Sequence, residues 1–490
     1  MSQHVDIVLI NPGDRRQIYQ GLGAELAAVE PPFWVAVLAA YLRNQGVKIA
    51  IIDANGENIA PEETARRAAQ MKPLLSCVVV YGSQPSASTQ NMTVAGAICR
   101  ALREERAGRV ALAGLHPSAL PQRTLAEEEV DFVIQGEGAD ALLALAGQLA
   151  SATPDLTLVP GLWYRSDDGM RSNAPAPLVE DLDSYLPVAA WDLLPMQAYR
   201  AHNWHCFDDI SQRSPYGAIY TSLGCPFNCV FCCINAPFGK PGIRYRSPER
   251  VLDEMELLVR EHGVKNLKIV DELFILKEAH YLAIVEGIIA RKLDLNIWAY
   301  ARVDTVKPAN LKRMKEAGIN WLALGIESAN AEVRDGADKR MQPRDIKEVV
   351  RAIQDAGIRV IGNFIFGLPD DSVETMEETL KLAQELNCEF INFYCAMAYP
   401  GSKLYDLALA QGWQLPAAWH DFSQHGYNLL PLPTRTLTAA QVLKFRDEAF
   451  HRYFAEPAYL EMVEAMFGAE VREHLVRMSE TRLKRKLLGE

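Results

Sequence analysis

Three cysteines lie within eight residues of this 490-residue chain, namely Cys225, Cys229 and Cys232, in the spacing C-x₃-C-x₂-C. Three closely spaced thiolates can hold three irons of a [4Fe–4S] cube and leave the fourth iron without a protein ligand. An open iron can bind a small molecule directly, so this loop predicts redox chemistry on a bound substrate or cosubstrate. The alternative is a closed zinc site, which needs a fourth ligand that Cys233 or Cys206 could supply.

The elements around this loop alternate between strands and helices. We expect strands at 216–222, 267–271, 296–302, 321–327, 360–366 and 389–395, and helices at 248–262, 277–291, 308–317, 343–356 and 373–386. Six strands joined by crossover helices predict a partial (β/α)6 TIM-like barrel. The active sites of such barrels lie at the carboxyl ends of the strands, and the cysteine loop follows the first strand.

The ends of the other barrel strands carry polar side chains that suit a zwitterionic ligand. Asp271 or Glu272 could accept hydrogen bonds from an ammonium group, and Arg302 could form a donor fork for a carboxylate. Glu327 could accept the hydroxyl protons of a ribose, and Gly367 follows the fifth strand. The alternative for the charged members is a structural network of salt bridges.

The first 150 residues predict a second, doubly wound sheet. Almost entirely apolar runs at 6–11, 47–53, 77–82, 109–114 and 131–135 indicate parallel strands covered on both faces, with helices at 33–44, 61–71, 90–104 and 120–128. Such Rossmann-like sheets bind ligands outside the carboxyl ends of their strands. The residues expected there are Asn11, Gly82, Ser83, Gly114, His116, Gly136, Glu137 and Gly138.

Composition excludes several classes of function. The formal net charge of −12 disfavours a nucleic-acid binder, which needs a basic field to neutralise phosphates. The chain has no apolar stretch of about 18 residues, so no membrane span is predicted, and the N-terminus lacks the features of a signal peptide. Nine unevenly spaced cysteines therefore indicate reduced thiols in a cytoplasm. The basic run near residue 485 is interpreted as a solvated helix end, with a partner-binding patch as the alternative.

The barrel motifs resemble the radical S-adenosylmethionine (SAM) superfamily. They are the cysteine loop with Phe231 before its third cysteine, Asp271-Glu272-Leu273-Phe274, Trp298-Ala299-Tyr300-Ala301-Arg302, Gly325-Ile326-Glu327-Ser328 and the run from Gly362 to Pro369. The resemblance implies a [4Fe–4S] cluster whose open iron chelates SAM, and one-electron cleavage of SAM to a 5′-deoxyadenosyl radical. It also implies SAM contacts by Asp271, Glu272, Arg302, Glu327 and Gly367.

The N-terminal half resembles the cobalamin-binding domain that precedes the barrel in one radical SAM subfamily. The motifs are Pro31-Pro32, Asp53-Ala54-Asn55, Gly114-Leu115-His116-Pro117 and Gly136-Glu137-Gly138. The chain departs from better-known cobalamin modules because it has no D-x-H-x-x-G run, so no histidine is assigned as the lower cobalt ligand. His116 is a candidate for that role, and a capping or core role is the favoured alternative.

Together the resemblances imply a cobalamin-binding domain at 1–150, a linker at 151–214, a radical SAM partial barrel at 215–405 and a helical region at 406–490. They imply a methyltransferase that acts on an unactivated carbon of a small molecule or natural product, through a 5′-deoxyadenosyl radical and methylcobalamin. A reducing partner such as flavodoxin or ferredoxin is also implied. Oxidative cyclisation, or another rearrangement without methyl transfer, is the alternative within the family. A non-catalytic iron–sulfur or zinc protein is the alternative outside it.

Overall fold

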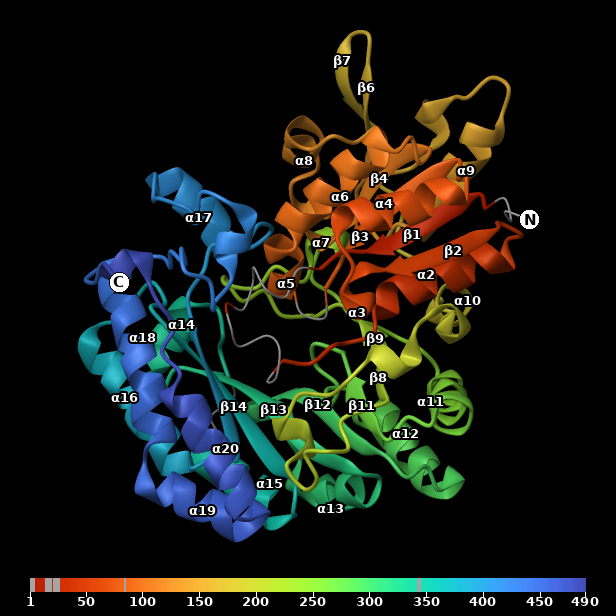
Figure 1. The fold of residues 1–490 in the computed structure, drawn as a ribbon. Helices are drawn as coiled ribbons and strands as arrows, with labels where there is room; N and C mark the ends of the chain where they lie inside the picture. Colours follow the sequence, from red (N-terminus) through yellow and green to blue (C-terminus); the bar gives the residue numbers. More distant parts are fainter. Residues whose placement is uncertain (1–4, 14–19, 21–26, 83–84, 342–344) are drawn as a thin grey trace.

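The structure is a computed structural model that describes residues 5–13, 20, 27–82, 85–341 and 345–490. It contains two sheets of mainly parallel strands, each covered by helices, with further helices from the C-terminal region along one side (Figure 1). The N-terminal sheet lies above the barrel sheet in this view, so that the two domains meet across a shared boundary. The expected fold class is thereby confirmed.

The N-terminal sheet has the strand order β2-β1-β3-β4-β5-β6-β7. Its strands are β1 (Ile7–Asn11), β2 (Ile49–Asp53), β3 (Leu75–Val80), β4 (Arg109–Gly114), β5 (Phe132–Ile134), β6 (Leu162–Ser166) and β7 (Gly169–Ser172). The first five are parallel, as predicted. The β6–β7 hairpin lies in the range predicted as a linker, and it extends this sheet in antiparallel pairing. It begins at Gly161 with φ +66°, where a Cβ would lie 2.4 Å from the Gln135 carbonyl oxygen.

Helices cover both faces of this sheet. They are α2 (Phe33–Asn44), α3 (Ala54–Glu57), α4 (Pro61–Gln70), α5 (Pro85–Gln90), α6 (Met92–Glu104), α7 (Leu115–Ala119), α8 (Pro121–Glu127) and α9 (Ala139–Ala150), followed by α10 (Leu182–Tyr185) in the linker. Helix α2 is apolar nearly all round because it lies between the two sheets. Phe33 and Trp34 reach Tyr220 of the barrel domain, with ring centroids 5.4 and 6.4 Å apart. One hydrophobic core therefore includes residues of both domains.

The barrel sheet has six parallel strands in the order β15-β14-β13-β12-β11-β8. The strands are β8 (Tyr216–Ile219), β11 (Asn266–Ile269), β12 (Asn296–Arg302), β13 (Ile319–Glu327), β14 (Arg359–Phe366) and β15 (Phe390–Cys395), and β9 (Ser222–Leu223) with β10 (Arg244–Tyr245) forms a small separate hairpin. All six strands were predicted within a few residues. Their order places the carboxyl ends of consecutive strands side by side, which is the geometry a barrel active site requires.

All but one of the crossover helices lie within a few residues of their predicted ranges, and the predicted start of one, residue 343, falls outside the described residues. They are α11 (Pro248–His262), α12 (Glu278–Arg291), α13 (Pro308–Glu316), α14 (Ala331–Gly336), α15 (Ile346–Asp355) and α16 (Val373–Leu386). Helix α11 is typical: the Ser247 hydroxyl caps its N-terminus, Pro248 occupies its first position, and Gly263 ends it in the left-handed conformation. Helix α14 was not predicted, because its six residues are too few to show a helical period.

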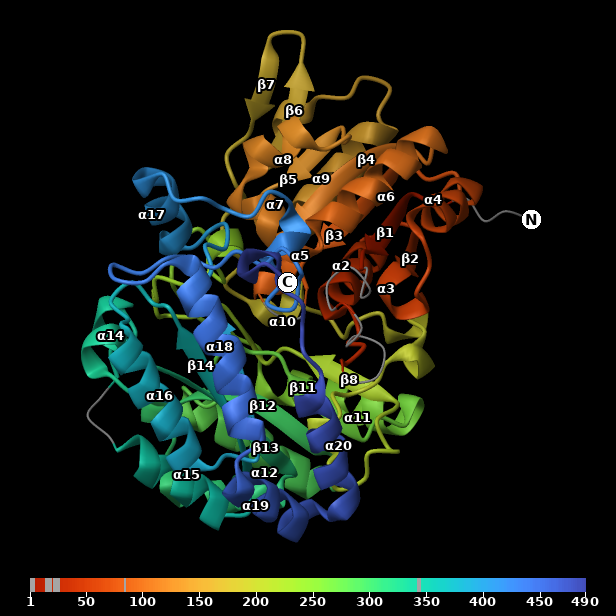
Figure 2. The ribbon, with the colours of Figure 1, turned by 60° about the vertical axis from the view of Figure 1, so that its left-hand side comes forward.

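The C-terminal region contains α17 (Lys403–Gln411), α18 (Ala439–Phe454), α19 (Pro457–Phe467) and α20 (Ala469–Glu480). Figure 2 shows α18 and α20 in front of the barrel strands. The sequence favours one continuous helix over 457–485 within the predicted helical region, and this prediction is wrong: Gly468, with φ +88°, separates α19 from α20, and α20 ends at Glu480. The interpretation of the basic run as a solvated helix end is also wrong for Arg485, whose side chain is fully buried.

Aromatic rings fill the barrel at the amino ends of its strands. Trp204, from the linker, packs against Trp298, Trp321 and Phe390, with ring centroids 5.2, 5.5 and 6.0 Å away. These four residues are called the aromatic floor below. Because it closes the barrel from one end, the space that remains lies toward the carboxyl ends of the strands, where the N-terminal sheet faces the barrel. In the part of the chain that the structure describes, no helix is both long and apolar enough to cross a membrane.

Candidate active site

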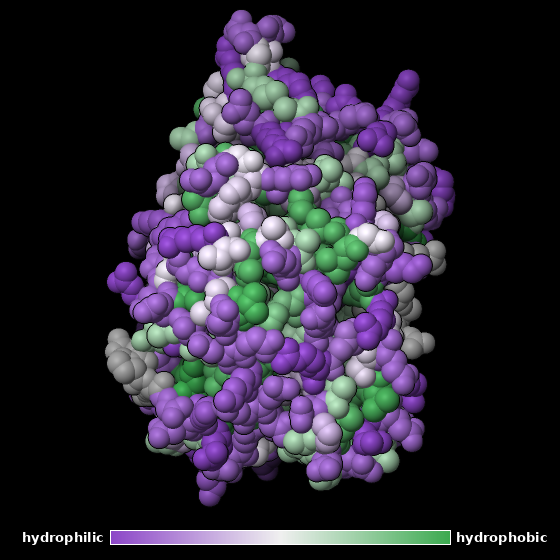
Figure 3. Space-filling view, turned by 90° about the vertical axis from the view of Figure 1, so that its left-hand side faces the viewer, coloured by the Kyte–Doolittle hydropathy of each residue, from purple (hydrophilic) through white to green (hydrophobic). Residues whose placement is uncertain are grey.

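A large cavity of about 860 Å³ lies between the two domains and the C-terminal helices. Residues from the carboxyl edge of the N-terminal sheet, from the cysteine loop, from the barrel strands and from α18 all line it. Figure 3 shows apolar side chains gathered near the middle of the face that carries the C-terminal helices, with hydrophilic residues around them. The volume of the cavity is in the range of small-molecule and cofactor sites.

Backbone hydrogen bonds to two other segments hold the cysteine loop in place. The Val230 N–H donates to the Ala337 carbonyl oxygen at 3.0 Å, and the Val230 carbonyl accepts from the Leu404 N–H at 2.9 Å. The three thiols are all free. Burial raises the pKa of Cys225 to about 11 and that of Cys232 well above its usual value. The thiols would have to release their protons on binding metal, as thiolate ligands require.

The two cysteines considered as a fourth zinc ligand have different surroundings. Cys206 lies beside Trp204 at the amino ends of the strands, opposite the cysteine loop, and its thiol is 3.7 Å from the Gln212 carbonyl oxygen. Cys233 is buried in an apolar cluster with Leu115 and Ile234, and Cys225 and Cys232 pack against the same cluster. Among the described residues, no group of three or more His, Cys, Asp or Glu side chains is placed to hold a single metal ion. In a [4Fe–4S] cluster each thiolate would bind a different iron.

The two acidic residues after β11 have different environments. Asp271 is fully buried and accepts hydrogen bonds from the Thr221 N–H and hydroxyl, both at 2.6 Å, so it holds the turn after β8. Glu272 lines the cavity, and its Oε2 is buried without a hydrogen-bond partner among the described residues. Burial raises the pKa of Glu272 to about 8. Of the two, only Glu272 is available to a cationic group in the cavity.

The raised pKa of Glu272 predicts a specific pH dependence of stability. The folded, metal-free protein keeps this proton up to about pH 8, whereas the unfolded chain releases it near the usual glutamate pKa of 4.5. The free energy of unfolding should therefore fall by up to about 1.4 kcal/mol per pH unit as the pH rises through this window. Chemical denaturation at several pH values will test this. Glu272→Gln should flatten the slope, and an equal slope in both proteins would contradict the assignment.

Arg302 lies at the carboxyl end of β12 and contacts the cysteine loop. Its guanidinium stacks over the Phe227 ring, 3.9 Å from the ring centroid. It also forms an ion pair with Asp304, with Nε to Oδ1 at 2.9 Å, and donates to the Arg340 carbonyl oxygen at 2.6 Å. Arg302 lines the cavity beside the loop, as expected, with its charge already partly neutralised by Asp304.

Glu327 forms a buried ion pair with Lys339, which the sequence analysis did not single out. The Lys339 Nζ lies 2.8 Å from Glu327 Oε1, and both side chains line the cavity. Burial alone lowers the pKa of Lys339, but the charges of Glu327 and Cys229 outweigh it and raise the pKa. Lys339 thus places a positive charge near the cysteine loop. Its only signal in the sequence is a short Asp-Lys-Arg run after an unpredicted helix.

Gly367 has a structural role in the packing of α18, in addition to the ligand contact expected from the sequence. It ends β14 with φ +81°, and a Cβ there would lie 2.4 Å from Val442 of α18. Its N–H donates to the Asp371 carboxylate at 2.9 Å. Among the described residues that line the large cavity, Gly367 is absent. The glycine therefore allows α18 to approach the barrel, and a contact between Gly367 and SAM stays a prediction.

On the N-terminal side, the structure brings only some of the expected residues to the cavity. Gly82 lines it, together with Tyr81, Ser86 and Gln90, which sequence reasoning missed. Asn11 lies at a smaller neighbouring pocket, and its amide donates to Asp53 Oδ1 at 2.7 Å. Ser83 falls outside the described residues. Gly114, Gly136 and Gly138 have positive φ angles and form turns, but none of these three glycines lines the large cavity.

His116 is buried inside the N-terminal domain. Its Nδ1 lies 3.1 Å from the Thr89 hydroxyl, and its ring meets Trp419 edge-on with centroids 4.5 Å apart. Burial, with a contribution from Arg123, lowers its pKa to about 3. These contacts favour the core role. We expect His116→Leu to leave the electron paramagnetic resonance spectrum of bound cob(II)alamin unchanged. Loss of nitrogen splitting in the variant would instead identify His116 as a cobalt ligand.

Glu137 joins the two domains. Its carboxylate forms a bidentate ion pair with Arg244 of β10, at 2.6 and 3.1 Å, and only 7% of its side chain is exposed. This pairing differs from the cobalamin contact expected from the sequence, because the carboxylate is already occupied by a guanidinium. The glycines on either side allow the turn that presents Glu137 to the barrel domain.

Removing the Arg244 side of this ion pair should weaken the domain boundary. Arg244→Met leaves the buried Glu137 carboxylate without its partner, and we expect the free energy of unfolding to fall by about 1–3 kcal/mol. Denaturant unfolding measures this, with Arg250→Met, at an exposed position of α11, as the control. A variant as stable as the control would show that the pair contributes nothing to the boundary.

Comparisons with known proteins agree with this arrangement. The Radical SAM superfamily model matches residues 219–383, and the B12 binding domain model matches residues 19–146. The chain is 30% identical over 456 residues to the uncharacterized methyltransferase PH0819 of Pyrococcus horikoshii, which covers 93% of each protein. It is 27% identical over 463 residues to an anaerobic magnesium-protoporphyrin IX monomethyl ester cyclase of Cereibacter sphaeroides, covering 92% of this chain and 71% of that relative.

Solved structures share the fold over nearly the whole chain. The radical SAM methyltransferase TsrM from Kitasatospora setae, solved with cobalamin and a [4Fe-4S] cluster, superposes with a TM-score of 0.71 at 18% identity, over 98% of this chain and 99% of that one. The cobalamin-dependent radical SAM enzyme OxsB superposes with a TM-score of 0.68 at 14% identity, over 96% of this chain and 72% of that one. The chain belongs to the radical SAM enzymes that carry a cobalamin-binding domain, and its cofactors are a [4Fe–4S] cluster, SAM and cobalamin.

Proposed function

We propose that this protein is a methyltransferase that transfers a methyl group to an unactivated carbon of a small molecule. The observation that carries the proposal is the shared cavity: the cysteine loop, the barrel mouth and the carboxyl edge of the N-terminal sheet all line one space of about 860 Å³. A cosubstrate at the barrel mouth and a corrin at the sheet edge would therefore both face the same acceptor. A methyltransferase relative at 30% identity supports the same function.

We assign the groups of SAM, and three irons of the cluster, to different residues of the barrel mouth. We assign the three cluster irons to Cys225, Cys229 and Cys232. Glu272 then accepts hydrogen bonds from the ammonium group of SAM, since its carboxylate has an oxygen in the cavity without a partner among the described residues. Arg302, fixed by Asp304 and by its stacking on Phe227, directs a donor toward the carboxylate.

Ribose binding is assigned to the Glu327–Lys339 pair. Glu327 accepts from the ribose hydroxyls, and Lys339 holds its carboxylate in place with a 2.8 Å contact. Glu327 has φ +66°, at a bulge where β13 shifts its pairing with β14. This local geometry turns the carboxylate into the cavity instead of along the strand.

On the opposite side, we assign the corrin-facing surface to the edge of the N-terminal sheet that lines the cavity, around Tyr81, Gly82, Ser86, Gln90 and Leu115. When bound, the cofactors supply SAM cleavage, hydrogen abstraction and methyl transfer, which no side chain here can perform. The protein binds and orients the cofactors and keeps water out of the cavity. The aromatic floor and the apolar contact between α2 and the barrel help to exclude that water.

We also propose that flavodoxin or ferredoxin supplies the electron, in a reducing cytoplasm. All nine cysteines are free thiols, which suits such a compartment. Spectroscopic titration of the cluster with reduced flavodoxin and, separately, with reduced ferredoxin will test the partner. A cluster spectrum that neither reduced carrier changes would reject it.

The function is tested by anaerobic reconstitution with iron, sulfide and cobalamin, followed by turnover with SAM that carries a deuterated methyl group. We expect 5′-deoxyadenosine, and an acceptor whose mass includes the labelled methyl group. Turnover by protein that binds no cobalamin would overturn the methyl-transfer proposal. The cyclase relatives favour oxidative cyclisation as the second candidate. It predicts 5′-deoxyadenosine with a product that lacks the label and has lost hydrogen.

A further inference from the structure

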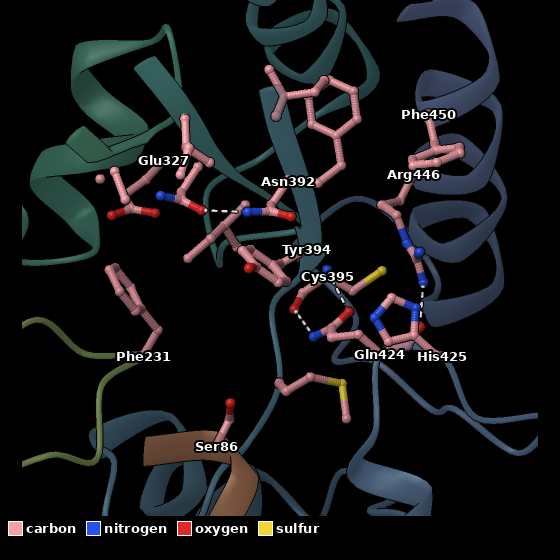
Figure 4. Close-up of a pocket in the computed structure, with 18 of the residues that line it drawn as sticks. Ser86, Phe231, Glu327, Asn392, Tyr394, Cys395, Gln424, His425, Arg446 and Phe450 are labelled. Atoms are coloured by element: carbon pink, nitrogen blue, oxygen red, sulfur yellow. Dashed lines mark hydrogen bonds between the residues drawn. The ribbon is translucent and has the colours of Figure 1, made fainter. Parts of the chain in front are cut away.

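The wall of the cavity formed by α18 carries an excess of buried positive charge. Arg446 and Arg485 are 4% and 0% exposed. They share a single carboxylate: Asp447 Oδ1 lies 3.1 Å from Arg446 Nη1, and its Oδ2 lies 2.9 Å from Arg485 Nε. One carboxylate cannot neutralise two guanidinium groups, so a net positive charge remains beside the cavity. Figure 4 shows Arg446 beside His425 and Gln424, across the cavity from Glu327 and Phe231.

The other contacts of the two arginines are neutral. Arg446 Nη2 donates to the Gln424 carbonyl oxygen, and Arg485 Nη1 donates to the Gly426 carbonyl oxygen, both at 2.8 Å. The Cys395 thiol lies against Arg446, but burial raises its pKa above the usual value, so it stays protonated at neutral pH. None of these groups supplies the missing negative charge.

His425 also lines the cavity, and the lowered pKa of its ring is consistent with a positive field there. Burial, followed by the charges of Arg446 and Arg485, lowers its pKa to about 3, so the ring is neutral. Two acidic groups lie at the rim. Glu448 lies 3.8 Å from Lys444, and the Glu490 carboxylate accepts a hydrogen bond from the Arg485 backbone N–H at 3.1 Å. Glu490 is exposed, so water screens its charge from the buried guanidinium groups.

Arg446 has unused hydrogen-bonding capacity. Its Nε is buried and has no hydrogen-bond partner among the described residues. Leaving a buried guanidinium both partly unpaired and uncompensated in charge is costly, and an oxyanion relieves both costs at once. Arg485 is less available, because its Nε already contacts Asp447 and its side chain holds the C-terminal segment in place.

We propose that Arg446 binds an anionic oxygen group, a carboxylate or a phosphate, on the molecule that the enzyme modifies. The apolar side chains of Met397, Phe450 and Leu488 line the same cavity, so it also offers apolar surface to the rest of that molecule. The identification of this ligand as the substrate rests on the proposed function. The binding of an organic anion at Arg446 does not.

Fluorine NMR titration of the reconstituted holoenzyme tests the anion site directly. The probes are 4-(trifluoromethyl)benzoate, 4-(trifluoromethyl)phenyl phosphate and the uncharged 4-(trifluoromethyl)benzamide. We expect at least one anionic probe to bind about tenfold more tightly than the amide, and Arg446→Gln to remove that difference. The probe that binds more tightly identifies the oxyanion. Arg452→Gln on the same helix, whose side chain pairs with Glu377 outside the cavity, is the matched control.

A second variant keeps the test decisive if Arg446→Gln does not fold. Asp447→Asn removes the one carboxylate that the two guanidiniums share, so we expect it to tighten binding of the anionic probe about three- to tenfold. Equal binding of the amide and both anions to the wild type would overturn the proposal, as would unchanged or weaker anion binding by Asp447→Asn. SAM cleavage by the wild type is measured separately, so its failure would reject the proposed function and leave the anion site intact.

Discussion

Replacing Cys229 by alanine is expected to abolish the cluster and SAM cleavage together. Cys229 is the middle member of the loop and is 9% exposed, so its loss leaves two thiols where three irons need ligands. We expect 5′-deoxyadenosine formation to fall by more than about a hundredfold, beyond the loss typical of changes to outer-shell partners of a metal. Iron content, visible absorption and product analysis after anaerobic reconstitution measure the effect.

Cys233→Ala is the matched control for this experiment. Cys233 is adjacent in sequence to the third loop cysteine and forms an apolar cluster with Leu115 and Ile234, against which Cys225 and Cys232 also pack. We expect this variant to keep its iron and its absorption, with a modest loss of stability of about 1 kcal/mol from the small cavity. Loss of iron in Cys233→Ala, or retention of iron in Cys229→Ala, would contradict the three-cysteine assignment.

Lys339→Met should produce the second large effect. The substitution leaves the Glu327 carboxylate buried without its 2.8 Å partner. Breaking one side of a buried ion pair costs about 3–5 kcal/mol. It also removes a positive charge near Cys229, so we expect SAM to bind at least about tenfold more weakly. Isothermal titration with SAM and denaturant unfolding measure the two effects separately.

The matched control for Lys339 is its neighbour. Arg340 follows it in the chain, and its side chain is exposed, so Arg340→Met should change neither stability nor SAM affinity. The double variant Lys339→Met with Glu327→Gln should recover part of the lost stability, because it removes the unpaired charge. If the single and double variants were equally unstable, the ion pair would not be the cause.

The sequence predicts the sheets well because their signals are local. Apolar runs, proline at the first helical position and glycine after the helices define β1 to β5 and the barrel strands within a few residues. The cysteine loop is equally local, since its three residues lie in one turn. The hairpin and the break at Gly468 are predicted less well, because a glycine alone does not distinguish a turn from a tolerated helix position.

The environment of a polar residue was harder to predict than its position. Asp271 and Glu272 are adjacent, yet one caps a turn and the other faces the cavity, because the hydroxyl and N–H of Thr221 lie beside only the first. Glu137 was placed at the correct edge, but its partner Arg244 is more than a hundred residues away. Such pairings depend on how the domains pack, which no local pattern specifies.

The aromatic floor has a consequence for access to the cavity. Trp204 and the rings around it fill the barrel at the amino ends of its strands, and Glu272 and Arg446 line one cavity. A cosubstrate at Glu272 and a second molecule at Arg446 would therefore share this space, so that each restricts the room left for the other.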